Sequence, residues 1–226
     1  MITPDGFIAT TTLDAAVNNG HVKFIRWQVH DDWVGQVKYY HEIDQVISCS
    51  NSSETSLVIG STMGSTHVEQ QLKEIKVIST SQEKMKQKYS YNQPKHRLEA
   101  DETVFKVHKG VKVFDFSKAK NILVTGGMDR IIRLWNPYVS GKPTAMLRGH
   151  ASPIFYLFIA DDDNRIFSLS MDRCIKVWEV QDHTCLLTIR PKSHKIRGDL
   201  QAVHYSSISN TLAVATDQIS FLNIKN

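Results

Sequence analysis

The sequence predicts an all-β protein assembled from a repeated unit of four short strands, and three observations lead to this prediction. The chain has 226 residues, of which 41% are hydrophobic and 22% charged, so it is long and apolar enough to bury a core. The pattern Met-Asp-Arg-x-Ile-(Arg/Lys)-(Leu/Val)-Trp occurs at 128–135 and again 43 residues later at 171–178. Short β-prone runs alternate with turn-forming residues around both copies. A period of this length is typical of stacked structural repeats.

The repeat extends beyond these two copies. Residues 217–223 form a third copy, and residues 54–60 form a poorer, earlier one. A second marker runs in step, because four histidines precede the acidic positions 54, 129, 172 and 217 by 24, 21, 22 and 23 residues: His30, His108, His150 and His194. One such histidine would be read as an ordinary core or surface residue, but four in step indicate a repeated structural role.

The segments between the markers are expected to be strands separated by turns. The β-prone runs are 111–116, 121–125, 131–135, 145–147, 165–169 and 185–189, and the turn signals are 136–137, 140–141, 161–164 and 209–210. Each unit therefore holds four strands and no convincing helix. Four-stranded units of this period match the blade of a radial propeller, in which each blade buries its faces against its neighbours.

The residues of one unit resemble the WD-repeat pattern of β-propellers: Gly149, His150, Ser168, Asp172 and Trp178. In that family, the histidine, the serine or threonine, the aspartate and the tryptophan form a hydrogen-bonded tetrad. The resemblance implies two structural tetrads, one of His150, Ser168, Asp172 and Trp178 and one of His108, Thr125, Asp129 and Trp135. Such bonding suits a buried carboxylate and a buried indole N–H. The outer units depart from the pattern: the first offers His30, Ser50 and Glu54 but Gly60, and the last offers His194 and Asp217 but Ala213 and Asn223.

The expected organisation is a partial ring of about four blades. Residues 1–29 are the tail of a preceding blade or an N-terminal extension, 30–108 a degenerate blade with a basic insertion at about 61–101, 109–149 and 150–193 two WD blades, and 194–226 a degenerate, truncated blade. Four blades leave two open faces with exposed apolar surface, which natural proteins avoid. We therefore expect a fragment of a larger propeller, or a short isoform completed by other material.

Catalysis is not expected from this chain. Repeated His, Ser and Asp could be taken for a hydrolase triad, but no G-x-S-x-G elbow accompanies them, and the resemblance gives them a structural role. The cysteines, Cys49, Cys174 and Cys185, form no C-x-x-C pair and have no zinc-type spacing, so we expect neither a metal nor a cofactor. The longest apolar run, 154–160, is too short to span a membrane.

The insertion is the most distinctive segment of the sequence. Residues 82–97 contain five Lys or Arg against one Glu, interleaved with tyrosines. One interpretation is a solvated loop on one blade. The other is a contact loop for an acidic partner, formed by Lys84, Lys86, Lys88, Tyr89, Tyr91, Lys95 and Arg97. Nucleic acid is an unlikely partner, because no recognised nucleic-acid module accompanies the loop and the net charge is only +4.

A propeller does not specify a chemistry, so function depends on its surfaces. Rigid blades with a basic insertion indicate a non-catalytic protein–protein interaction scaffold. Residues 30–34, 124–130 and 135–143 are similar to the cilia-associated WD repeat-containing proteins 49 and 64. That resemblance implies a cytoskeletal, structural component of the axoneme of motile cilia or flagella, with tubulin or a neighbouring axonemal protein as partner. The alternative is a soluble WD-repeat adaptor unrelated to cilia, such as a ubiquitin-ligase receptor or a signalling hub.

Overall fold

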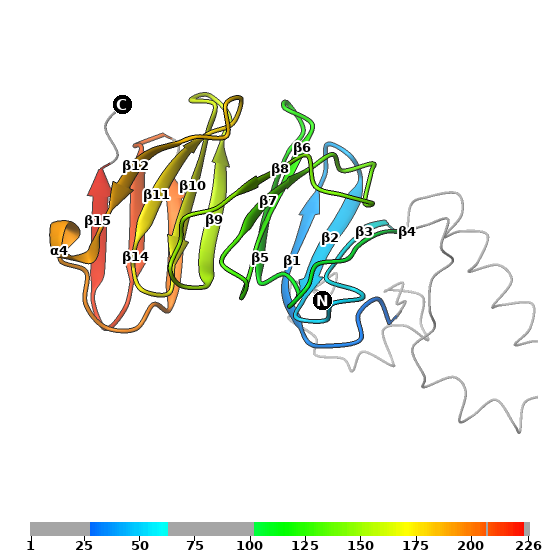
Figure 1. Cartoon of the computed structure of the whole chain (residues 1–226), viewed down its shortest axis with the longest axis horizontal. Helices are drawn as coiled ribbons and strands as arrows, with labels where there is room; N and C mark the ends of the chain where they lie inside the picture. Colours follow the sequence, from blue (N-terminus) through cyan, green and yellow to red (C-terminus); the bar gives the residue numbers. More distant parts are fainter. Residues whose placement is uncertain (1–27, 63–101, 207, 224–226) are drawn as a thin grey trace, which may run out of the picture.

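A computed structural model describes residues 28–62, 102–206 and 208–223 of the chain. The described residues form four antiparallel sheets that stand side by side in a row (Figure 1). The row does not close into a ring. The predicted all-β fold class, a partial propeller, is thereby confirmed. The expected N-terminal segment lies almost wholly outside the described residues, as does most of the insertion.

Strands follow one another in sequence order within every sheet. The first sheet contains β1 (Val34–Tyr40), β2 (Gln45–Ser50), β3 (Leu57–Ser61) and β4 (Glu102–Phe105). The second contains β5 (Val113–Ser117), β6 (Ile122–Gly126), β7 (Ile132–Trp135) and β8 (Ala145–Leu147). The third contains β9 (Ile154–Ala160), β10 (Arg165–Ser170), β11 (Ile175–Glu179) and β12 (Cys185–Ile189). The fourth contains β13 (Ala202–Ser206), β14 (Thr211–Ala215) and β15 (Ile219–Asn223).

One short helix was not expected from the sequence. α4 (Pro191–His194) is a single turn between the third and fourth sheets. Pro191 suits its first turn because proline has no N–H to leave unpaired there. Lys195 ends it in the left-handed conformation, with φ 59°. Within the described residues no helix is long and apolar enough to cross a membrane.

The turn between the first and second strands has the same chemistry in every sheet. Its last residue has a positive φ and is Asp44, Asn121, Asn164 or Asn210. Asparagine and aspartate adopt this left-handed conformation more readily than other residues with a side chain. These four residues therefore close each hairpin at the equivalent position, and two of them lie in the turns expected at 161–164 and 209–210.

The core lies between the sheets, in three clusters. Ile47, Phe105, Phe114 and Trp135 pack between the first and second sheets. Val124, Leu134, Ile166 and Trp178 pack between the second and third. Phe167, Val177, Leu212 and Val214 pack between the third and fourth. The two inner sheets thus bury both faces, and the two outer sheets bury one face each.

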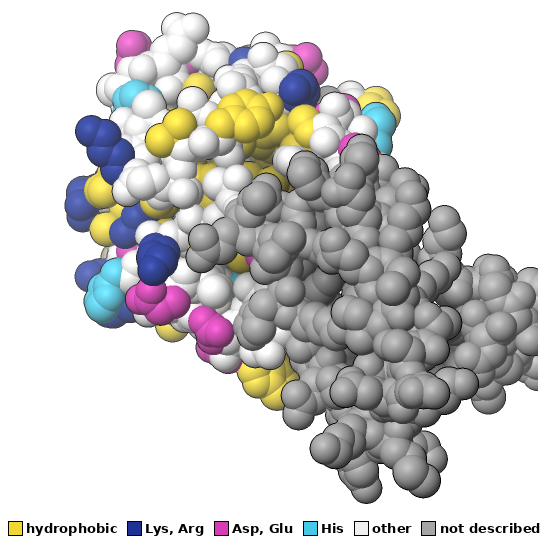
Figure 2. Space-filling model, turned by 90° about the vertical axis from the view of Figure 1, so that its right-hand side faces the viewer, with side chains coloured by type: hydrophobic (Ala, Val, Ile, Leu, Met, Phe, Trp, Pro, Cys, Tyr) yellow, Lys and Arg dark blue, Asp and Glu magenta, His cyan; other side chains and the backbone are white. Residues whose placement is uncertain are grey.

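The two ends of the row are different from its interior. Val37 and Tyr39 on the first sheet and Ile219 and Phe221 on the last are exposed. Figure 2 looks onto the end formed by the first sheet, where hydrophobic side chains lie among charged ones. Large apolar side chains on both outer faces are what an open, partial ring leaves uncovered.

Candidate functional site

The third sheet contains a buried polar network of three residues. The Trp178 indole N–H donates to the Ser168 hydroxyl at 2.8 Å, and the same hydroxyl lies 2.7 Å from Nε2 of His150. All three side chains are buried. Since a hydroxyl has one proton, Ser168 accepts from the indole and can donate to a neutral imidazole. The network joins the loop before β9 to β10 and β11.

Electrostatics keep this histidine neutral. Burial, reinforced by the positive charge of Lys176, lowers the pKa of His150 from 6.5 to about 4, while Asp172 opposes the shift. At neutral pH the imidazole can therefore accept a hydrogen bond without carrying charge. The arrangement resembles a catalytic pair only in composition, because Ser168 is 2% exposed and its hydroxyl is bonded to both neighbours.

Asp172 does not join the network as the tetrad requires. Its Oδ1 accepts from the Ser170 hydroxyl at 2.5 Å and from the Cys174 N–H at 3.2 Å, so it stabilises the turn between β10 and β11. Among the described residues, nothing bonds to Nδ1 of His150. The expected tetrad is therefore a three-residue network beside a separately bonded aspartate.

Of the expected tetrad of the second sheet, only the bond between the tryptophan and the threonine is present. The Trp135 indole donates to Oγ1 of Thr125 at 2.9 Å, and Asp129 forms an ion pair with Arg133 at 2.6 Å. His108, however, is exposed, while its neighbour Val107 is buried. The 43-residue repeat aligns position 150 with 107, so His108 stands one residue late. Residues 107–110 form a turn, in which the Gly110 N–H donates to the Val107 oxygen at 2.8 Å, and the side chain of His108 within this turn is exposed. The expectation of a tetrad including His108 was wrong for this reason.

The first sheet has a histidine network that contains Ser48 and not the expected Ser50. Nε2 of His30 lies 2.7 Å from Oγ of Ser48, and Nδ1 lies 2.5 Å from the carbonyl oxygen of Thr55. Ser50 instead donates to that carbonyl at 2.8 Å. The missed signal was spacing, because His30 precedes Ser48 by 18 residues, as His150 precedes Ser168. Gly60 occupies the tryptophan position, so no indole completes this network.

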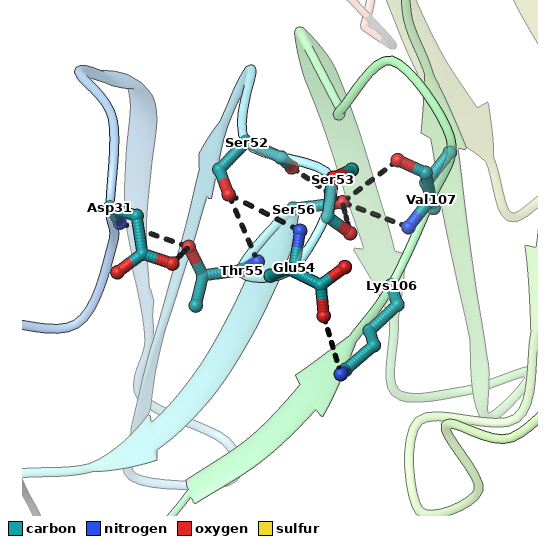
Figure 3. A network of polar contacts seen from close by, with 8 residues as sticks. All are labelled: Asp31, Ser52, Ser53, Glu54, Thr55, Ser56, Lys106 and Val107. Carbon is teal, nitrogen blue, oxygen red and sulfur yellow. Dashed lines mark hydrogen bonds and ion pairs between the residues drawn. The ribbon is translucent and has the colours of Figure 1, made fainter.

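A hydroxyl-rich turn joins β2 to β3 in the first sheet (Figure 3). The Ser52 hydroxyl accepts from the N–H groups of Glu54 and Thr55. The Ser56 hydroxyl accepts from the Val107 N–H at 2.8 Å, and its nearest acceptor is the Ser52 carbonyl oxygen at 2.7 Å. Glu54 pairs with Lys106 at 2.6 Å on the surface. Glu54 therefore pairs with the residue that follows β4, and its side chain forms no described bond to His30.

The fourth sheet has no polar network at the corresponding place. Residues 18 apart are here Ile196 and Val214, both buried in the same apolar cluster. His194 lies outside that cluster, and its Nε2 is 2.8 Å from the carbonyl oxygen of Arg173. It thus links the third sheet to the segment before the fourth. Ala213 and Asn223 pair as ordinary strand residues.

A second polar centre, not foreseen from the sequence, joins three sheets. Asp115 on β5 accepts from Nζ of Lys38 at 3.0 Å and from the Tyr40 hydroxyl at 3.2 Å, both on β1. Its other oxygen accepts from the Ile159 N–H on β9 at 2.9 Å. One carboxylate therefore connects the inner strands of consecutive sheets.

The remaining candidates are the insertion residues, possible metal ligands and the cysteines. The predicted contact residues of the insertion, Lys84, Lys86, Lys88, Tyr89, Tyr91, Lys95 and Arg97, lie outside the described residues. Within the described ranges, no group of His, Cys, Asp or Glu is arranged to hold a metal ion. Burial raises the pKa of Cys49 to about 12, which leaves this thiol unreactive.

The family model "WD domain, G-beta repeat" matches residues 101–136 and 141–179. Each match starts on the outermost strand of one sheet and continues through three strands of the next, so a sequence repeat links neighbouring sheets. A crystal structure of the WD40 beta propeller domain of Doa1 is similar to 88% of this chain and 54% of that one, with a TM-score of 0.59. At 16% sequence identity, this similarity shows a shared fold and nothing further.

Relatives by sequence include two proteins called WD repeat-containing protein on Y chromosome. The one from Drosophila virilis is 40% identical over 107 residues, which is 47% of this chain and 8% of the relative. The one from Drosophila mojavensis is 43% identical over 88 residues, which is 39% of this chain and 7% of the relative. The chain therefore spans less than a tenth of the length of these relatives. Two segments of the chain match the WD-repeat model, and the described residues have the fold of part of a β-propeller.

Proposed function

We propose that the chain is a non-catalytic protein–protein interaction scaffold and a structural component of the axoneme of motile cilia. The scaffold role is supported by the position of the repeated polar residues, which point into the core. His150, Ser168 and Trp178 bond to one another in the core, where they hold a sheet together instead of facing a substrate. A rigid stack of sheets of this kind offers its rims as binding surfaces, and WD40 domains generally mediate protein–protein interactions.

The axonemal location is supported by sequence. The stretches 30–34, 124–130 and 135–143 are similar to the cilia-associated WD repeat-containing proteins 49 and 64. In this proposal the basic insertion faces the acidic tails of tubulin or a neighbouring axonemal protein. Further residues of a longer chain supply the remaining blades. No nucleic acid, membrane or cofactor is part of the proposal.

Localisation in ciliated cells tests the axonemal part. A tagged protein should remain with the axoneme after detergent extraction, and cross-linking mass spectrometry should connect it to tubulin or an adjacent axonemal protein. Recovery in the detergent-soluble fraction, with cross-links to partners independent of microtubules, would contradict the axonemal role and support the soluble adaptor.

Charge reversal tests the insertion. Exchange of Lys84, Lys86, Lys88 and Lys95 for Glu should abolish co-sedimentation with microtubules, because four attractions to acidic tails become repulsions. The melting temperature should stay nearly constant. The matched control exchanges four exposed lysines elsewhere, Lys118, Lys142, Lys192 and Lys195, for the same change in net charge. Equal loss of binding in both variants would mean that net charge, and not the insertion, governs binding.

A further inference from the structure

One rim of the row is built by the segments before β5 and β9 and by the turns β6–β7 and β10–β11. β9 begins where β10 ends, since Ile154 pairs with Ser170. Two backbone bonds join the parts of this rim: the Ile154 N–H donates to the Gly127 oxygen at 3.1 Å, and the Met171 N–H donates to the Pro153 oxygen at 2.8 Å. The rim is therefore one continuous, bonded surface across the second and third sheets.

Two methionines stand at equivalent positions on this surface. Met128 and Met171 are 43 residues apart, and each is 48% exposed. The ammonium group of Lys112 connects the sheets, at 3.8 Å from the Met171 sulfur and 5.4 Å from the centroid of the half-buried Phe155 ring. A lone exposed apolar residue needs no explanation, but here Met171 and Phe155 lie against the same ammonium group, and Met128 stands at the equivalent position of the adjacent sheet. We call it the methionine rim: Lys112, Met128, Arg130, Phe155, Met171 and Arg173.

The methionine rim is positively charged. Arg130 and Arg173 have φ of 68° and 66° and reach the next loop, where their guanidinium groups donate to the Ala151 oxygen at 3.5 Å and the Gly198 oxygen at 2.7 Å. The adjacent carboxylates are occupied, Asp129 by Arg133 and Asp172 by its own turn. Within the described part of the chain, no ion pair joins Lys112, Arg130 or Arg173 to a carboxylate.

The corresponding turns of the outer sheets have a different character. In the first sheet the turn contains Ser52, Ser53 and Glu54, and in the fourth it contains Thr216 and Asp217. Both turns are polar and carry negative charge. Within the residues that the structure describes, exposed thioethers are thus combined with cations only in the second and third sheets, which are also the two sheets where the sequence repeat is strongest.

We infer that the methionine rim docks a short protein segment in which acidic and apolar side chains are combined. Thioethers adapt to irregular apolar side chains, while Lys112 and the two guanidinium groups attract carboxylates. A purely anionic ligand would leave Met128 and Met171 unused, and a purely apolar one would leave the cations unpaired. This inference rests on the proposed scaffold function and names one of its binding surfaces.

Peptide binding to the purified chain tests the inference. The probe is a fluorescein-labelled peptide of about twelve residues that combines Glu and Leu, and two companions replace every Leu by Ser or every Glu by Lys. Fluorescence anisotropy should show selective binding of the Glu–Leu peptide. Met128→Ser with Met171→Ser, or Lys112→Glu alone, should weaken binding about tenfold or more.

Matched controls use the same substitutions away from the rim. Met146 on the outer strand β8 is 45% exposed, so Met146→Ser removes an equally accessible thioether. Lys118 lies in the β5–β6 turn at the opposite rim, so Lys118→Glu makes the same charge change. Both controls should bind like the unaltered chain. Equal weakening in the controls, equal binding of the Glu–Ser peptide, or no binding of the Glu–Leu peptide would each overturn the inference.

The test is separable from that of the proposed function. Axonemal retention together with an absence of peptide binding would contradict peptide docking at the methionine rim and still support the scaffold function. Selective peptide binding by a chain that is fully detergent-soluble in cells would contradict the axonemal role and still support peptide docking at the methionine rim.

Discussion

The second and third sheets are two copies of one motif that bury different polar groups. In both, a tryptophan indole donates to a hydroxyl on the neighbouring strand: Trp135 to Thr125, and Trp178 to Ser168. Only the third sheet adds a histidine, since Val107 occupies the position of His150 in the second. The indole–hydroxyl bond and the apolar burial of the tryptophan are thus the common requirement, and the histidine is an addition that a buried valine replaces.

The largest expected effect should be shared by the two sheets. Trp135→Ala and Trp178→Ala should each lower the free energy of unfolding by about 3–5 kcal/mol, because each removes a side chain that is 2% exposed and leaves a cavity between two sheets. Urea titration followed by circular dichroism measures both. A near-zero effect at either position would mean that the repeat register is misassigned there.

Removal of the hydroxyl should destabilise the third sheet more than the second. Thr125→Val leaves one buried donor without a partner, the Trp135 N–H, and should cost about 1–3 kcal/mol. Ser168→Ala leaves both the Trp178 N–H and Nε2 of His150 unpaired, so its cost should be roughly twice as large. The same urea titration decides this. Equal costs would show that the His150 contact adds nothing to stability.

Acid should also distinguish the sheets. The pKa of His150 is lowered to about 4 in the folded chain, against 6.5 for an unperturbed histidine. The unfolded chain therefore binds the proton more tightly, and the stability contributed by the neutral imidazole is present above pH 6.5 and lost as pH falls toward 4. The slope from one such group is at most about 1.4 kcal/mol per pH unit. Burial lowers the pKa of His30 as well, so it adds to the loss in the same direction.

Thermal melts between pH 7 and pH 4 measure this dependence. His150→Gln should flatten the curve, and His30→Gln should remove a further part. His108→Gln is the matched control, because His108 is exposed and should leave the curve unchanged. A curve unaffected by His150→Gln would contradict burial of the neutral imidazole.

The smallest effect is expected at the hairpin turns. Asn121 and Asn164 close the first hairpin of the second and third sheets with φ of 51° and 55°. Replacement of Asn121 by Ala should cost about 1 kcal/mol, since alanine is less tolerant of the left-handed conformation, while Gly should be nearly neutral. At Asn164 both replacements should cost more, because they also remove the hydrogen bond that its amide donates to Glu179 at 2.6 Å. Differential scanning calorimetry resolves the difference, and equal costs would show that the bond to Glu179 adds nothing to stability.

Sequence spacing predicted the hydroxyl–indole pairs. It was wrong about one histidine, His108, and about the serine that bonds to another, Ser48. Trp178 and Ser168 were identified because motif and period agree at both positions. His108 fits the expected spacing to within one residue, but it lies in the turn at 107–110, where its side chain is exposed. Ser48 was missed because Ser50 lies closer to the acidic marker, while the 18-residue interval from His30 was not used.

The amino-acid sequence by itself determined the all-β class, the 43-residue period, and the residues that pair locally across neighbouring strands. These features depend on alternation, turn residues and spacing along one chain, which are local properties. Tertiary structure alone decided that Val107 replaces a histidine in the core and that Asp115 joins β1, β5 and β9. It also decided that Met128 and Met171 share one rim. These contacts join residues tens of positions apart, so they exist only once the sheets have packed against one another.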